Sequence, residues 1–136
     1  MKPYKENHFQ GEFSKDYKQS HKFPGVGTVP YELKRTIGGT VAFSKFEDQQ
    51  LPSLVACKTH EGFNFKLTDA SLGAKPFDGI IFRDCPASYV GIVFHANDKA
   101  KRSFWFIEID DVMALKTIQK SITLKNCQKL GFELKL

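Results

Sequence analysis

Four short apolar segments in the middle of the chain constrain its fold more than any other sequence feature. Each segment is rich in Phe, Ile, Val or Tyr and is bounded by turn residues, a pattern typical of β-strands. The segments cover residues 62–67, 78–83, 88–95 and 103–109. Asn97 and Asp98 provide turn chemistry between the last two, so we expect a hairpin there.

The residues before these segments predict two helices and a strand. Phe9, Phe13 and Tyr17 recur at spacings of four, which is typical of an amphipathic helix over residues 6–18. Residues 28–36 predict a strand, and residues 37–40 a turn. Ser44 is a candidate cap for a helix that begins near Lys45, with Pro52 in its first turn or at a bend.

The residues after the apolar segments predict a helical tail. We expect a short helix at 110–116 and a second helix that begins at Ser121 or Thr123 and ends near Gly131. Residues 132–136 are a candidate edge strand. Together these elements predict an α/β (α+β) fold in which a central mixed β-sheet is flanked by helices.

Length and composition predict a single intracellular domain over residues 1–136. No apolar run reaches the roughly 18 residues that span a membrane, and no apolar stretch follows the first residues as in a secretory signal. We therefore expect a cytoplasmic protein. The three widely spaced cysteines indicate neither a disulfide framework nor a zinc knuckle. The net charge of +5 permits a polyanionic partner.

The segment Tyr31-Glu32-Leu33-Lys34-Arg35 combines a carboxylate and an amine that suit phosphodiester hydrolysis. On a strand, Glu32 and Lys34 share one face, about 6.6 Å apart along the strand. A carboxylate holds Mg²⁺, and the metal activates a bound water. A lysine orients that water or stabilises the developing charge. Taken alone, Glu-x-Lys is more often an ordinary solvated strand face.

Three further residues are candidates for the same site. Asp78 directly precedes the apolar Ile80-Ile81-Phe82 and is a candidate second metal ligand, brought beside Glu32 by sheet pairing. Glu12 lies on the flank of the Phe9/Phe13 stripe and is a third candidate ligand. Gln50 lies near the start of the helix that follows the Glu-x-Lys strand. Each of these residues has an ordinary alternative as a solvent-facing side chain.

In this order and spacing, the elements resemble the PD-(D/E)-X-K nuclease superfamily, and within it the Holliday-junction resolvases of the RecU type and their small phage relatives. The matching pieces are the helical Glu12, the strand with Glu32 and Lys34, and the following helix with Gln50 and Leu54. An alternating apolar hairpin over residues 89–94 and 104–109 comes after them. The resemblance covers most of residues 6–112 and implies a restriction-endonuclease-like core.

The sequence departs from the superfamily pattern in one respect. The superfamily normally places a Pro-Asp aspartate before the Glu-x-Lys strand, but the only aspartate between Gly11 and Glu32 is Asp16, on the predicted helix. The Pro-Phe-Asp element that ends at Asp78 comes after that strand instead. We expect that the aspartate has migrated to this later strand.

The resemblance implies a homodimeric endonuclease that acts in DNA recombination and repair. It would cut two opposed strands of a four-way junction or another branched DNA with Mg²⁺, for which Mn²⁺ can substitute. Glu32, Lys34, Asp78, Glu12 and Gln50 would form the catalytic group, with Asp78, Glu32 and Glu12 holding the metal. Phosphates on either side of the scissile bond would be bound by a basic set: Lys15, Lys18, Lys22, Arg35, Lys45 and Lys75.

Two other function classes stay open at this point. The aromatic strands are also compatible with a nucleic-acid-binding module that has no catalytic activity. A small-molecule enzyme is the third possibility. Gly25-x-Gly27 is too short for a dinucleotide loop, and it precedes a strand rather than a helix.

Overall fold

A four-stranded mixed sheet forms the centre of the computed structural model, which describes residues 28–68, 75–98 and 101–135. Its strands, in spatial order, are β1 (Tyr31–Thr36), β5 (Tyr89–Phe94), β6 (Ser103–Glu108) and β8 (Phe132–Glu133). β1 runs parallel to β5, and the other pairings are antiparallel. The predicted mixed sheet, the hairpin at Asn97–Asp98 and the C-terminal edge strand are confirmed. The helix predicted over residues 6–18 lies outside the described residues.

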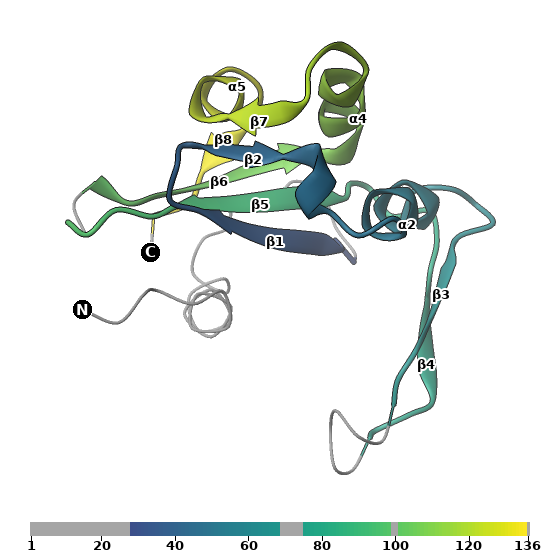
Figure 1. Ribbon diagram of the computed structural model, residues 1–136. Coiled ribbons are helices and arrows are strands. Elements are labelled where there is room, and N and C mark those ends of the chain that lie inside the picture. Colours follow the sequence, from purple (N-terminus) through teal and green to yellow (C-terminus); the bar gives the residue numbers. More distant parts are fainter. Residues whose placement is uncertain (1–27, 69–74, 99–100, 136) are drawn as a thin grey trace.

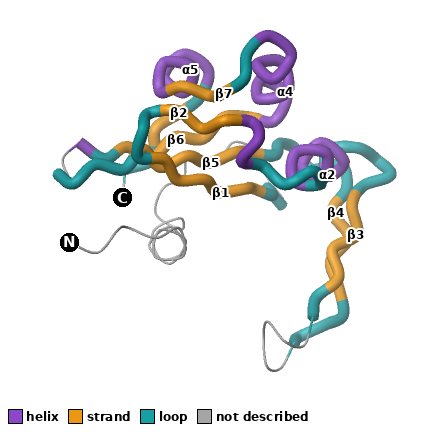
Figure 2. The backbone as a smooth tube through the Cα atoms, viewed as in Figure 1, coloured by secondary structure: helices purple, strands orange, loops and turns teal. Residues whose placement is uncertain are grey.

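Helices and a second, smaller strand pair cover one face of this sheet (Figures 1 and 2). The helices are α2 (Gln50–Cys57), α4 (Ile109–Ile118) and α5 (Leu124–Leu130). Between them, β2 (Thr40–Ala42) pairs antiparallel with β7 (Ser121–Thr123), and the 3-10 helix η1 (Phe43–Lys45) follows β2. The expected turn at residues 37–40 thus leads into a short strand that periodicity did not reveal.

A buried apolar cluster joins this helical layer to the sheet. Leu51 and Leu54 of α2 and Val112 of α4 pack with Val90 and Ile92 of β5. Cys127 of α5 is completely buried in the same cluster, and burial raises the pKa of its thiol to about 12. A second cluster, with Leu33, Phe104 and Phe106 among its members, lies on the opposite face of the sheet.

Glycine at position 91 allows side chains of β1 and β6 to pack over β5 on that opposite face. A Cβ at Gly91 would lie 2.7 Å from Leu33 Cδ2 and 2.8 Å from Phe106 Cε1. Such contacts are closer than packed carbon atoms tolerate, so a larger residue would displace the Leu33 and Phe106 side chains. Gly91 therefore makes room for these two side chains in the cluster on that face.

Local sequence determines where the helices begin. α2 begins at Gln50 rather than near Lys45, and Ser44 lies in η1 instead of capping α2, while Pro52 does lie in the first turn. The Glu108 side chain accepts a hydrogen bond from the Asp110 N–H and caps α4. Thr123 caps α5 through a reciprocal pair of contacts with Asn126, so this helix begins at the second of its two predicted positions and ends at Gly131.

Two of the predicted strands form a separate ribbon. β3 (Phe63–Lys66) and β4 (Gly79–Phe82) pair antiparallel with each other and with no strand of the central sheet. Figure 1 shows this ribbon projecting away from the helices and the sheet. Among the described residues, no helix has both the length and the apolar character needed to cross a membrane.

Candidate functional site

The pleat of β1 places Glu32 and Lys34 on the sheet face that carries the helices. Leu33 between them turns to the opposite face and packs in its apolar cluster. Lys34 Nζ lies 3.2 Å from Glu32 Oε1, and the two side chains are only 14% and 25% exposed. The predicted common face is confirmed, and the two residues form a half-buried ion pair.

Gln50, the first residue of α2, joins this pair. Its Nε2 donates a hydrogen bond to Glu32 Oε1 over 2.8 Å. Its own Oε1 accepts the backbone N–H of Glu47 over 2.9 Å, which fixes the orientation of the amide. Lys34 and Gln50, which the sequence predicted to act together with Glu32, therefore both contact the Glu32 carboxylate.

Phe46 is a member of this site that the sequence did not indicate. Lys34 Nζ lies 5.1 Å from the centroid of its ring, within the range of a cation–π contact. Phe46 is itself 7% exposed and belongs to the helical-side core. Phe46 comes two residues after Ser44, and an apolar residue near a predicted helix start indicates a core position. The sequence therefore did not mark it as a functional residue.

The donor atoms at the site fit Mg²⁺ in part. Within the described part of the chain, Gln50 and Lys34 both contact Oε1 of the Glu32 carboxylate, and no protein donor bonds Oε2. Mg²⁺ commonly uses one or two carboxylates and completes its octahedron with water and phosphate oxygens. Among residues 28–68, 75–98 and 101–135, no three His, Cys, Asp or Glu side chains form a group that would hold a metal ion.

Asp78 does not reach this site through sheet pairing. The strand that follows it, β4, pairs with β3 in the ribbon and not with β1, so the expected route to Glu32 is wrong. The Asp78 side chain is 96% exposed, and its carboxylate lies 3.2 Å from Lys75 Nζ. The apolar run after Asp78 predicted a strand but carried no information about that strand's partner.

The other expected site residues are spread more widely. Glu12, Lys15, Lys18 and Lys22 lie outside the described residues. Lys45 is exposed on η1.

Arg35 lies on the sheet face opposite Glu32 and Lys34. Its charge acts on His95, directly after β5: burial, Arg102 and Arg35 together lower the pKa of that imidazole. Arg35 is therefore separated by the sheet from the carboxylate that it was expected to serve.

A groove of about 480 Å³ opens beside the carboxylate. Glu32 and Gln50 line one part of it, and Phe63, Phe65 and Phe82 of the ribbon line another. The volume is in the range of sites that admit small organic groups. The candidate site is thus open to a ligand from the side of the ribbon.

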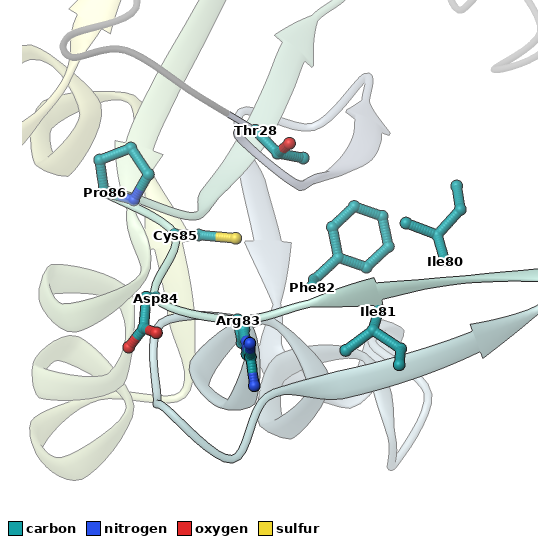
Figure 3. Close-up of a pocket in the computed structure, with 8 residues that line it drawn as sticks. All are labelled: Thr28, Ile80, Ile81, Phe82, Arg83, Asp84, Cys85 and Pro86. Carbon is teal, nitrogen blue, oxygen red and sulfur yellow. The ribbon is translucent and has the colours of Figure 1, made fainter.

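A second hollow, of about 210 Å³, lies where the ribbon joins the sheet and is lined by Thr28 and residues 80–86. Figure 3 shows Phe82 on one side of β4, with Ile81 and Arg83 on the other, as the pleat requires. The Asp84 carboxylate points away from Phe82 in this view, and it contacts His60 Nδ1 at 2.9 Å. This hollow has no carboxylate directed into it that resembles the Glu32 group.

Comparisons with known proteins give no match for this chain. No protein-family model, no curated protein and no solved structure is significantly similar to it. The function proposed for this chain therefore follows from the geometry of its site alone.

Proposed function

We propose that this protein is an Mg²⁺-dependent endonuclease with a restriction-endonuclease-like core that hydrolyses phosphodiesters in branched DNA, with the four-way junction as its main substrate. The observation that supports this proposal most strongly is the contact of both Lys34 and Gln50 with Glu32 Oε1. Glu32 and Gln50 are 18 residues apart in the chain, and their meeting depends on the fold.

Each member of the group has a chemical role in this proposal. Glu32 Oε2 would hold Mg²⁺, which when bound supplies an acidified water and neutralises charge on the phosphate. Gln50 holds the carboxylate through Oε1, so that Oε2 would be available to the metal. Lys34 brings a positive charge to the place where negative charge develops on the phosphate oxygens.

The test is cleavage of a synthetic four-way junction with Mg²⁺ and with chelator. We expect cutting only with the metal. Glu32→Gln and Lys34→Ala should each lower the rate at least about 100-fold while much of the binding remains, because both groups act on the transition state. Glu61→Gln and Lys66→Ala are matched controls, since both residues are exposed and lie outside the group.

The opposite outcomes identify the other function classes. Equal cutting by the site variants and the parent would contradict the assignment of Glu32 and Lys34. Salt-sensitive binding without metal-dependent products would indicate a non-catalytic nucleic-acid-binding module. The single carboxylate at the described site favours this alternative. Nucleic-acid affinity no greater than that of any basic protein would indicate a small-molecule enzyme.

A further inference from the structure

Nearly all of the net positive charge of the chain comes from its last 25 residues. Residues 112–136 contain five lysines and one glutamate, which contribute +4 of the formal +5. A charge asymmetry of this kind is a common mark of a surface that binds a polyanion. The lysines are Lys116, Lys120, Lys125, Lys129 and Lys135.

Four of these lysines are exposed and lie in or beside three consecutive elements, and we call them together the C-terminal lysine surface: Lys116, Lys120, Lys125 and Lys129. Lys116 lies in α4, Lys120 precedes β7, and the other two lie in α5. These elements form the outer layer above the sheet in Figure 1. Among the described residues, no carboxylate forms an ion pair with any of the four, whereas Lys135 lies 3.0 Å from Glu133.

Contacts within the fold link this surface to the candidate site. The Phe43 N–H donates to the Lys120 carbonyl over 3.0 Å. The Phe43 ring lies 6.4 Å from that of Phe46, which carries the Lys34 ammonium above it. Lys45, exposed on η1 and adjacent in the chain to Phe46, adds a fifth positive charge.

We infer that the C-terminal lysine surface, together with Lys45, binds the phosphate backbone of a double-stranded DNA arm that extends from the scissile site. This inference rests on the proposed function, because that function places a DNA strand at Lys34. Ammonium groups without a carboxylate partner repel one another, and a duplex relieves this repulsion while it releases condensed counterions. Phosphate contacts of this kind position a duplex and do not read its sequence.

The test is junction binding in chelator, where no cutting occurs, as a function of salt concentration. The double variant Lys116→Gln/Lys120→Gln is compared with Lys66→Gln/Lys101→Gln, which removes the same charge from the ribbon and from the β5–β6 connection. Each lost phosphate contact lowers the log–log salt slope by about 0.9. At about 0.1 M salt, that slope corresponds to roughly eightfold weaker binding per contact.

We expect the Lys116/Lys120 variant to lose one or two units of slope and the control to lose almost none. Equal losses in both variants would overturn the inference, because net charge alone would then explain the binding. Unchanged binding in both would overturn it as well. Cleavage with Mg²⁺ is scored separately: a parent that does not cut, but whose binding still depends on Lys116 and Lys120, would refute the nuclease proposal and leave the duplex surface intact.

Discussion

At the scale of single residues, the candidate site depends on which oxygen of one carboxylate is engaged. Lys34 and Gln50 both contact Glu32 Oε1. A carboxylate held in this way has a defined orientation, and no protein donor in the described part of the chain bonds its second oxygen. Gln50 is therefore a positioning residue in our proposal, and its contribution is separable from that of Glu32 itself.

We expect Gln50→Ala to lower cleavage about 10–100-fold and to raise the Mg²⁺ concentration needed for half-maximal activity, as the loss of groups that orient metal ligands commonly does. Gln49→Ala is the matched control, because Gln49 is the adjacent amide and bonds Glu47 rather than Glu32. Cleavage is measured across an Mg²⁺ titration. A loss of activity without any change in the Mg²⁺ requirement would contradict the positioning role.

At the scale of elements, the position of Gln50 depends on how α2 is fastened to the rest of the fold. Lys58, directly after α2, donates to Glu108 Oε1 and to Asp110 Oδ2, at the start of α4. Burial of Lys58 lowers its pKa, but the hydrogen bonds to Asp110 and Glu108 outweigh this, so the net pKa is raised. The ammonium thus connects the helix that carries Gln50 to the helix that follows β6.

We expect Lys58→Met to lower the free energy of unfolding by about 1–2 kcal/mol at pH 7, because it removes two charge-assisted hydrogen bonds at a partly exposed position. A raised pKa means that this stabilisation is complete below about pH 10.5 and declines as the pH rises through the folded value. Urea unfolding at pH 7 and at higher pH measures both effects. Lys66→Met is the control, and a difference between parent and Lys58→Met that widens above pH 10.5 would contradict the assignment.

Sequence periodicity predicted elements better than it predicted their partners. Segments rich in Phe, Ile, Val or Tyr located β5 and β6, and Asn97 with Asp98 connected them correctly. The same kind of pattern located β3 and β4, but those strands pair with each other in a ribbon. Such a pattern indicates that a segment is a covered strand, but it does not identify the element that covers it or pairs with it. β2, with three residues, is too short for any period to be visible.

The site was predictable to the extent that it follows from local geometry. Glu32 and Lys34 share a face because every strand alternates its side chains. Gln50 meets them because the chain returns over β1 through β2 and η1 to α2, and the order of the elements indicated a helix after β1. The placement of Asp78 required knowledge of long-range pairing, and the roles of Phe46 and the C-terminal lysines required the packed structure.

At the scale of the whole molecule, the proposal combines a site, a groove and a charged surface in one subunit. Glu32 and its neighbours would act on one strand, the groove beside them opens toward the ribbon, and the C-terminal lysine surface would hold one duplex arm. One such subunit would cut one DNA strand. Resolution of a four-way junction needs two opposed cuts, which a twofold-symmetric pair of subunits provides.

Mixed dimers test this requirement. A plasmid with an extruded cruciform is incubated with the active protein co-refolded with increasing amounts of Glu32→Gln. A homodimer in which each subunit cuts one strand should yield more nicked circles and fewer linear molecules as the inactive share rises, because mixed dimers make a single cut. Glu61→Gln in place of Glu32→Gln should leave the ratio unchanged. If the linear and nicked products instead fall together in proportion to the active protein, each subunit acts alone and the dimer proposal is wrong.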